Sequence, residues 1–455
     1  MRLLKKLPIL LPLFCLGLFP AFGLLPASAR EAPCPEAAGL HVPGSERQVF
    51  SCLEDLTTPG LLRTGHTVIS DWTGLHSIQT PPPERPVPGV QIDGYFPDTS
   101  SFNTHHGWNH DAQFVLRLPH DWNGKLIVTG APGNRRQYAL DFTISDWAVS
   151  RGYAFASTDK GNSGTSFYRD GKHPGDAVRE WHRRVTELTR AAKETLRLRY
   201  GREADRIYIT GISNGGYLTR YALENHPDLY DGGVDWEGTL FRAEGPNLFT
   251  YLPVALREYP SYRSGDRGAY GRMIDAGFPP GSEFLWDFHY TYYWDLTQRI
   301  YREEFDPGYD GEREAGIPFC QSGTPGCDTD YDYASRPPSV KEAIRKVSLD
   351  GTIGKPLITL HGTLDTLLPA RTDSDVYHRL IRQNGRAELH RYYMVEGGTH
   401  VDALYDLYPD RLRPILPCYR EAFEHLEKWV EEGRKPPSNR EIPRKDPDPV
   451  NHCSM

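Results

Sequence analysis

The sequence lacks any apolar run long enough to cross a membrane after its first 25 residues. It also lacks a basic excess, since 52 Lys and Arg stand against 60 Asp and Glu, giving a net charge of −8. No Cys-x-x-Cys pair, internal repeat or low-complexity tract is present. These absences argue against an integral membrane protein, a nucleic-acid partner and a zinc-ribbon domain.

The first 29 residues have the pattern of a secretory signal peptide. Arg2, Lys5 and Lys6 precede a mostly apolar stretch, and Ala27-Ser28-Ala29 is a small-residue cleavage site. Four prolines interrupt the apolar stretch, which argues against a membrane anchor. We expect residues 1–29 to be removed on export. The remaining chain is then expected to be secreted or periplasmic, with no membrane partner.

Six cysteines follow this segment, and an even number in an exported chain implies disulfides. Metal binding is the alternative, but the spacing lacks a zinc-site pattern. We predict that cysteines adjacent in sequence pair, which gives Cys34–Cys52, Cys320–Cys327 and Cys418–Cys453.

The segment Gly211-Ile212-Ser213-Asn214-Gly215-Gly216 is the strongest motif in the chain. It follows a β-branched run at 205–210 and precedes an amphipathic stretch at 217–226, so we expect it between a strand and a helix. Gly-x-Ser-x-Gly in that setting is typical of a nucleophile elbow, in which a strained turn exposes the serine hydroxyl. We predict Ser213 as a nucleophile. A plain turn with a serine N-cap is the alternative.

Strands and helices alternate along the chain from residue 111. Expected strands cover 113–119, 125–130, 153–159, 205–210, 355–362 and 391–395; expected helices cover 145–150, 176–200, 217–226 and 417–432. This alternation predicts an α/β fold with a mostly parallel central sheet and helices on both faces.

Several segments resemble the tannase and feruloyl esterase family of α/β-hydrolases. They are Trp122-Asn123-Gly124-Lys125-Leu126, Gly152-Tyr153-Ala154-Phe155-Ala156-Ser157-Thr158-Asp159, Tyr200-Gly201 and the serine motif. The resemblance covers about 110–235 and 345–435, and it implies an α/β-hydrolase fold that cleaves esters. The family has a disulfide between a Cys before the nucleophile and a Cys after the catalytic His. This chain has Ile212 and Val401 there, so we expect an apolar packing contact and a changed ester preference.

A carboxylate and a histidine follow two late strands. Asp365 comes after the strand at 355–362, and His400 after the strand at 391–395. With Ser213 they keep the Ser, Asp, His order of α/β-hydrolases, and the resemblance carries the same roles onto them. The alternative acids are Asp235, Glu237, Asp373 and Asp402, while His361 is interpreted as structural.

The oxyanion hole in this fold takes one backbone N–H from the residue after the nucleophile, here Asn214, and one from the loop after an earlier strand. We place the second donor near Ala131, which follows the strand at 125–130.

These observations divide the chain into five parts. They are the signal peptide 1–29, an irregular arm 30–110 with a hairpin around Leu61 to Thr80, the catalytic core 111–237 and 346–435, an inserted lid 238–345, and a tail 436–455. The lid carries eight aromatic side chains at Phe284, Trp286, Phe288, Tyr290, Tyr292, Tyr293, Trp294 and Tyr301. Most are interpreted as the core of the lid, and some as the wall of a groove for aromatic or polymeric esters.

Two clusters raise the question of metals. His105, His106 and His110 lie close together in sequence, but a polar loop is the favoured interpretation because no further ligand has helical spacing. Asp328-Thr329-Asp330-Tyr331-Asp332 indicates a structural calcium as a lesser alternative, because the glycine and closing glutamate of an EF-hand are absent. The chemistry itself is expected to need no cofactor.

The sequence therefore predicts an exported serine carboxylester hydrolase, a monomer or homodimer. Feruloyl or galloyl esters are the first expected substrates, and hydroxyalkanoate or other polyester oligomers the second. A secreted serine exopeptidase and a non-catalytic binding protein on a hydrolase scaffold remain the alternatives.

Overall fold

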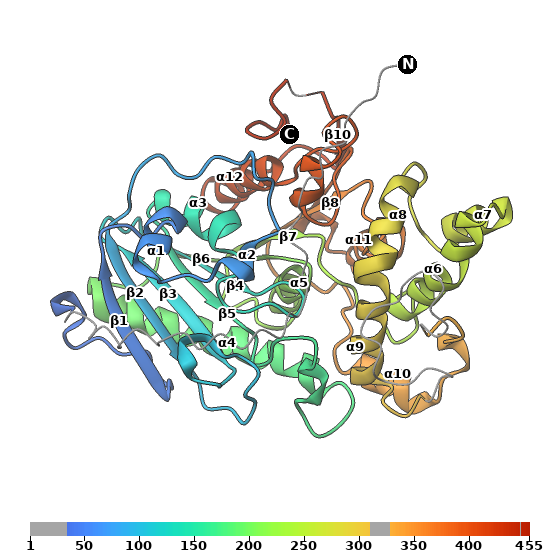
Figure 1. The fold of residues 1–455 in the computed structure, drawn as a ribbon. Coiled ribbons are helices and arrows are strands. Elements are labelled where there is room, and N and C mark those ends of the chain that lie inside the picture. Colours follow the sequence, from blue (N-terminus) through green and yellow to red (C-terminus); the bar gives the residue numbers. More distant parts are fainter. Residues whose placement is uncertain (1–33, 310–327, 446) are drawn as a thin grey trace, which may run out of the picture. The chain divides into compact units, whose positions relative to one another are not determined.

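A computed structural model describes residues 34–309, 328–445 and 447–455. Within this part a ten-stranded sheet has the order β1-β2-β3-β5-β4-β6-β7-β8-β9-β10 (Figure 1). The strands are β1 (Arg47–Leu53), β2 (Gly89–Tyr95), β3 (Gln113–Pro119), β4 (Lys125–Gly130), β5 (Ala154–Thr158), β6 (Arg206–Ile212), β7 (Gly232–Trp236), β8 (Leu357–Gly362), β9 (His390–Val395) and β10 (Arg440–Ile442).

The α-helices of the described residues alternate with these strands. They are α1 (Thr58–Thr64), α2 (Ile69–Trp72), α3 (Asp146–Ser150), α4 (Asp176–Tyr200), α5 (Asn214–Asn225), α6 (Leu248–Arg263), α7 (Arg267–Asp275), α8 (Glu283–His289), α9 (Asp295–Phe305), α10 (Pro338–Arg345), α11 (Ser374–Gln383) and α12 (Leu416–Glu432). A π-helical turn, Tyr290–Trp294, joins α8 to α9.

The sheet is parallel from β5 and β4 through to β10, whereas β1, β2 and β3 run antiparallel at the other edge. The predicted mostly parallel α/β fold is confirmed. Since parallel strands point the same way, their carboxyl ends lie together. The loops after β6, β7, β8 and β9 all leave the sheet from these ends. These loops carry the candidate catalytic residues.

Helices cover both faces of the sheet. Apolar residues of α4, α5 and α11, such as Val185, Leu218 and Ile381, belong to one buried cluster. Residues of α3 and α12, such as Ala148 and Phe423, belong to a second. Figure 1 shows α12 and α3 on one side of the strands and α4 on the other. The sheet thus has two separate apolar layers, as its near-continuous hydrophobic strands require.

The region before residue 111 differs from the sequence prediction. Strands β1 and β2 extend the sheet, so this region is not an irregular arm. The predicted hairpin around Leu61 to Thr80 is wrong, because α1 and α2 form there. Pro59 in the first turn of α1 and Gly65 at its end, with φ of 75°, are the signals of a short helix. At the other terminus, β10 pairs with β9, so the tail also adds a strand.

The inserted lid, residues 238–345, lies between β7 and β8 in sequence and contributes α6 to α10. Trp286, Tyr290, Trp294 and Tyr301 are buried, which agrees with their interpretation as the core of the lid. Phe288 and Tyr293 are half-buried, and Tyr292 is 50% exposed. These last three rings contact one another through Phe288 and remain available to line a binding surface.

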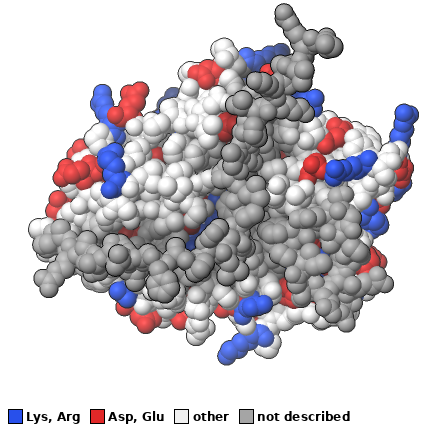
Figure 2. Space-filling model, viewed as in Figure 1, with Lys and Arg blue, Asp and Glu red and all other residues white. Residues whose placement is uncertain are grey.

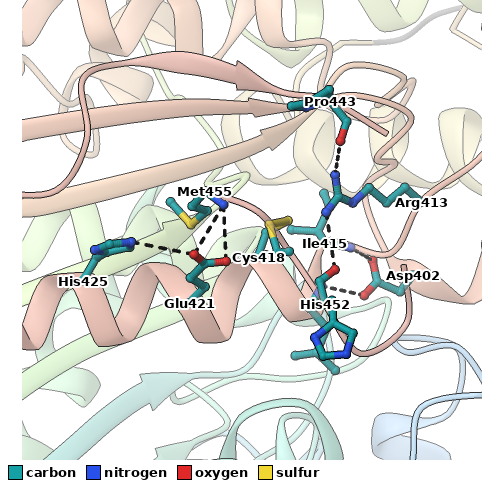
Figure 3. Close-up of a disulfide and its surroundings, with 11 residues drawn as sticks. Asp402, Arg413, Ile415, Cys418, Glu421, His425, Pro443, His452 and Met455 are labelled. Carbon is teal, nitrogen blue, oxygen red and sulfur yellow. Dashed lines mark hydrogen bonds and ion pairs between the residues drawn. A yellow bond between two sulfur atoms is a disulfide. The ribbon is translucent and has the colours of Figure 1, made fainter. Parts of the chain in front are cut away.

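Two predicted disulfides, Cys34–Cys52 and Cys418–Cys453, are present. Cys320 and Cys327 lie outside the described residues. Figure 3 shows the second bond, which joins α12 to the C-terminal segment, together with the hydrogen bond from the Met455 backbone N–H to Glu421. The end of the chain is therefore held against α12.

No helix among the described residues is long and apolar enough to cross a membrane. On the face seen in Figure 2, acidic and basic side chains are interspersed among the described residues rather than gathered by sign.

Candidate active site

Ser213 occupies a strained turn between β6 and α5. Its φ and ψ are 58° and −117°, a region that residues with a side chain rarely adopt. The neighbouring glycines make the turn possible. A Cβ on Gly211 would lie 2.5 Å from the backbone of Gly215, and a Cβ on Gly215 would lie 2.5 Å from the carbonyl oxygen of Gly130. The backbone thus has the geometry of a nucleophile elbow.

Four neighbouring parallel strands each end in a candidate residue. Ser213 follows β6, Glu237 follows β7, Asp365 follows β8 by a short loop, and His400 follows β9 by another. Backbone hydrogen bonds hold adjacent ends together: the Ser213 N–H donates to Trp236, and the Glu237 N–H donates to Leu360. The predicted nucleophile, acid and base therefore all follow the carboxyl ends of neighbouring parallel strands.

Asp365 and His400 form a direct pair. The Nδ1 atom of His400 lies 2.8 Å from Oδ2 of Asp365. The other oxygen, Oδ1, accepts the backbone N–H groups of Leu367 and Leu368 at 2.7 and 2.9 Å. These bonds fix the carboxylate, which in turn fixes the imidazole through Nδ1 and leaves the Nε2 atom outside this pair.

Burial and charge act on this pair in opposite directions. Burial favours a higher pKa for Asp365, but the charge and hydrogen bond of His400 lower that pKa below its ordinary value. Burial also favours a lower pKa for His400, but Asp365 overcomes this and raises it to about 10. The Asp365 carboxylate therefore stays ionised and stabilises an imidazolium.

Glu237 is a further carboxyl at this site, which the sequence indicated only as an alternative acid. Its Oε2 atom lies 3.3 Å from Nδ1 of His400, and its side chain is fully buried. The other three alternatives are engaged elsewhere. Asp235 and Asp373 pair with Arg220, and Asp402 accepts the N–H groups of Ile415 and Leu416. The structure thus separates Glu237 from the other candidates.

His361, interpreted from sequence as structural, is fully buried on β8. Its Nδ1 atom lies 2.7 Å from Oγ of Ser374, and its Nε2 atom lies 2.8 Å from the carbonyl oxygen of Leu368. Its Nε2 atom therefore holds the loop that carries Asp365, and its Nδ1 atom contacts the start of α11.

The predicted oxyanion donor at Ala131 is wrong. Its N–H donates to the carbonyl of Thr158 at 3.0 Å, because the pairing between β4 and β5 continues through this residue. The N–H of Asn214 lies in the first turn of α5, where helical N–H groups have no intrahelical acceptor. Asn214 therefore remains the predicted donor. In the loop after β4, the N–H groups of Gly133 and Asn134 have no backbone acceptor among the described residues.

The lid contacts both sides of the site. Tyr301 of α9 accepts a hydrogen bond from the Asn214 side chain at 2.6 Å. On the acid loop, Trp294 donates to the carbonyl of Thr366 at 2.8 Å, and Nδ1 of His289 lies 2.8 Å from the Thr366 hydroxyl. The lid thus contacts the elbow and the loop that carries Asp365.

Ile212 and Val401, which replace the family's cysteine pair, both belong to the apolar cluster on the α12 face of the sheet. Ile212 is fully buried, and Val401 packs against the cluster while partly buried. Both side chains thus have apolar surroundings, and a packing contact between the two stays a prediction.

The candidate metal ligands named from sequence have protein partners. His105 pairs with Asp71 at 2.8 Å, His106 with the Tyr138 hydroxyl at 2.7 Å, and His110 with a backbone carbonyl. In the acidic segment of the lid, Asp328 pairs with Arg302, and Asp332 caps a short helical turn. A structural calcium there stays a prediction.

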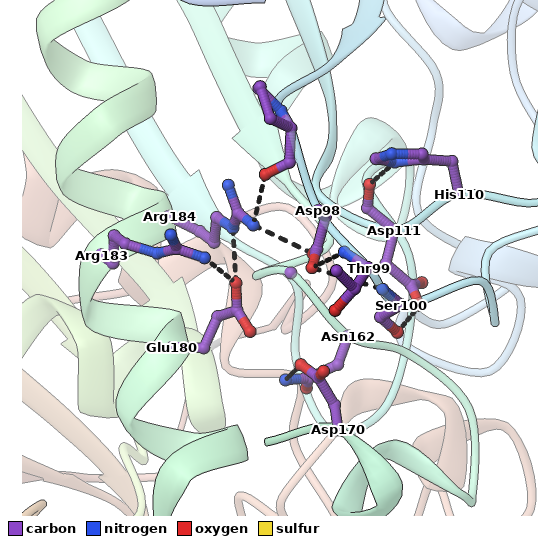
Figure 4. A network of polar contacts seen from close by, with 12 residues as sticks. Asp98, Thr99, Ser100, His110, Asp111, Asn162, Asp170, Glu180, Arg183 and Arg184 are labelled. Carbon is purple, nitrogen blue, oxygen red and sulfur yellow. Dashed lines mark hydrogen bonds and ion pairs between the residues drawn. The ribbon is translucent and has the colours of Figure 1, made fainter. Parts of the chain in front are cut away.

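Asp98, Asp170 and Glu180 form another acidic cluster (Figure 4). Arg184 lies between two of these carboxylates, 3.0 Å from Asp98 and 2.8 Å from Glu180. Asn162 donates to Asp170 at 3.2 Å. These contacts connect α4 to the loops before β3 and after β5.

Comparison with known proteins agrees with the fold. Residues 99–235 match the family model "Tannase and feruloyl esterase". Feruloyl esterase B from Aspergillus oryzae has a similar structure, with a TM-score of 0.57 and 14% identity over 88% of this chain and 90% of that one. Tannin acyl hydrolase from Aspergillus niger gives a TM-score of 0.50 with 15% identity over 88% and 86% of the two chains.

A relative in sequence is the mono(2-hydroxyethyl) terephthalate hydrolase of Piscinibacter sakaiensis, which is 29% identical over 143 residues. The match covers 28% of this chain and 23% of that protein, so it spans about a quarter of the relative's length. The strand order and the elbow geometry are those of an α/β-hydrolase fold. Residues 99–235, the part of the chain that includes Ser213, are similar to the tannase and feruloyl esterase family.

Proposed function

We propose that this protein is an exported serine hydrolase that cleaves carboxylic esters through an acyl-enzyme at Ser213. The observation that carries the proposal is the 2.8 Å hydrogen bond between His400 and Asp365 at the strand ends that also hold the strained Ser213 turn. His400 takes the proton of Ser213 as its oxygen attacks the ester carbonyl, and returns a proton to the leaving alcohol. Water then hydrolyses the acyl-enzyme by the same route.

Backbone N–H groups stabilise the tetrahedral oxyanion. One comes from Asn214, at the N-terminus of α5, where the helix dipole also favours negative charge. The other comes from the loop after β4, for which Gly133 and Asn134 offer unused donors. Losing one such donor typically costs roughly 3 kcal/mol of barrier stabilisation.

The substrate is an ester of an aromatic acid, with feruloyl and galloyl esters first and polyester oligomers second. The family match and the terephthalate ester in the relative's name support an aromatic acyl group. The half-buried Phe288 and Tyr293 support it as well, because His289, next to Phe288 in sequence, contacts Thr366 of the loop that carries Asp365. Aromatic faces of this kind bind planar acyl groups by stacking.

Export is part of the proposal. Disulfides persist in secreted and periplasmic chains, and two are present here. The reaction needs no cofactor, since nucleophile, base and oxyanion donors all come from the chain.

A fluorophosphonate probe tests the mechanism. We expect it to label Ser213 in the wild type, and we expect Ser213→Ala to lose both labelling and at least about 1000-fold in turnover while remaining folded. The exposed Ser150→Ala variant is the matched control and keeps both. Wild-type protein that neither labels nor turns over p-nitrophenyl esters would exclude this proposal. Cleavage of amino-acyl anilides instead of methyl ferulate would indicate the exopeptidase.

A further inference from the structure

Glu237 occupies an unusual position at the end of β7. Its φ is 49°, in the left-handed region that a residue with a Cβ rarely adopts, although it is neither in a glycine position nor at a surface turn. Its side chain is completely buried. Strained residues persist only where the surrounding structure holds them in place, and they cluster at functional sites.

The side chain of Glu237 is directed at the acid and the base. Its Oε1 atom accepts the backbone N–H of Gly362, at the end of β8. Its Oε2 atom lies 3.3 Å from Nδ1 of His400 and has no hydrogen-bond partner within the part of the chain that the structure describes. The carboxyl group is also within hydrogen-bonding reach of Asp365. Glu237, Asp365 and His400 place one side-chain atom each within 4.8 Å of one another.

Two buried carboxyl groups at this separation share a proton more readily than they both ionise. Asp365 has the better hydrogen bonds to His400 and to two backbone N–H groups, so it keeps the negative charge. Burial and the charge of Asp365 raise the pKa of Glu237 well above its ordinary value. Other titratable groups facing the cluster are His361 on β8, His289 on α8 and Tyr251 on α6. Burial lowers the pKa of both histidines and raises that of the tyrosine.

This inference rests on the proposed function. We infer that Glu237 is a second acid of the triad and acts as a positioning residue. Its protonated carboxyl group donates a hydrogen bond to Asp365, and Glu237 replaces Asp365 as the partner of His400 when the Asp365 carboxylate is removed. In the wild type the proton of Ser213 moves to Nε2 of His400, Asp365 stays ionised and Glu237 stays protonated. In an Asp365→Asn variant the Glu237 proton is released to solvent, and its carboxylate accepts the Nδ1 proton of His400.

Four proteins test the replacement: wild type, Glu237→Gln, Asp365→Asn and the double variant. Gln keeps the oxygen that accepts from Gly362, so the local packing is preserved. In the presence of Asp365, we expect Glu237→Gln to slow fluorophosphonate labelling less than about threefold. In the Asp365→Asn background, it should slow labelling at least about tenfold. The rate of Asp365→Asn should also rise with pH as Glu237 ionises, and this rise should be absent from the double variant.

Equal rates for Asp365→Asn and the double variant, with the same pH dependence, would overturn the replacement role. So would an effect of Glu237→Gln that is as large with Asp365 as without it, because this would indicate a purely structural contribution.

Thermal stability tests the protonation state without requiring activity. The pKa of Glu237 is higher in the folded than in the unfolded chain. The free energy of unfolding therefore falls as the pH rises from about 4.5, the ordinary pKa of the group, towards its pKa in the folded chain. Glu237→Gln removes this loss, so its melting temperature relative to the wild type should increase from pH 5 to pH 8. A constant difference would overturn the inference. If the wild type does not label at all, the proposed function fails, while the melting comparison still decides whether Glu237 holds a proton.

Discussion

The side-chain amide of Asn214 and the hydroxyl of Tyr301, which are 87 residues apart in sequence, are joined by a hydrogen bond of 2.6 Å. The same amide nitrogen donates to the carbonyl of Gly133 at 3.0 Å, and the amide oxygen accepts from the Thr239 hydroxyl at 3.1 Å. The residue predicted to supply an oxyanion N–H is therefore held by the lid, the loop after β4 and the loop after β7. The lid is therefore connected to the residue that the proposed mechanism uses as an oxyanion donor.

Replacing Tyr301 by Phe should lower kcat more than it changes KM. The substitution removes one hydrogen bond to Asn214, whose net value of about 0.5–1.5 kcal/mol corresponds to roughly a twofold to tenfold loss in rate. Steady-state kinetics on p-nitrophenyl esters measure the effect. Tyr292→Phe, at a ring that is 50% exposed, is the control and should keep kcat. A change in KM alone would mean that Tyr301 contributes only to substrate binding.

The pH dependence of kcat/KM should report His400. Asp365 raises its pKa to about 10 against the effect of burial, and only the neutral imidazole accepts the Ser213 proton. We therefore expect kcat/KM to rise with pH from neutral into the alkaline range. The stability that this shift provides is fully present below about pH 6.5 and is lost as pH rises towards 10. A profile that levels off below pH 6.5 would contradict this assignment.

The elbow could be predicted from sequence because its determinants are local. Gly211, Ser213 and Gly215 lie within five residues of one another, and a strand and a helix with clear patterns flank them. Asp365 and His400 follow strands of equally clear apolar character. Chain order then sufficed to select them, because parallel strands deliver successive loops to one edge.

The features that the sequence did not predict depend on long-range contacts or on strands without a regular apolar pattern. Strand β2 contains Gly89, Gly94 and the buried polar residues Gln91 and Asp93, so it lacks an apolar signature. Gln91 and Asp93 are accommodated through hydrogen bonds to one another and, for Gln91, to Arg117 on β3. No sequence pattern reports that kind of compensation.

The same limit applies within the site. Whether Ala131 is free to bind an oxyanion depends on how far β4 pairs with β5. Glu237 was one of four possible acids, and only the positions of the neighbouring strands distinguish it. Asp235, two residues earlier, instead faces Arg220 at 2.7 Å.

The ion pair between Arg220 and Asp235 allows a test of the stability of the fold. Arg220 of α5 is fully buried and donates to Asp235 at 2.7 Å, to Asp373 at 2.8 Å and to the Ser374 hydroxyl at 2.7 Å. Its two carboxylate partners in turn accept backbone N–H groups from Gly238 and Leu240, in the loop after β7. The guanidinium thus neutralises two buried charges that hold the chain just beyond Glu237.

Arg220→Met should destabilise the fold by roughly 3–5 kcal/mol, because it leaves both carboxylates buried without a cation. Urea unfolding followed by circular dichroism at pH 8 measures the change. Arg183→Ala is the matched control: its side chain is 62% exposed, its partner Glu180 lies on the same helix, and its removal should cost less than about 1 kcal/mol. Adding Asp235→Asn and Asp373→Asn to Arg220→Met should recover part of the loss. A loss below about 1 kcal/mol for Arg220→Met, or no recovery in the triple variant, would show that these charges are compensated by other groups.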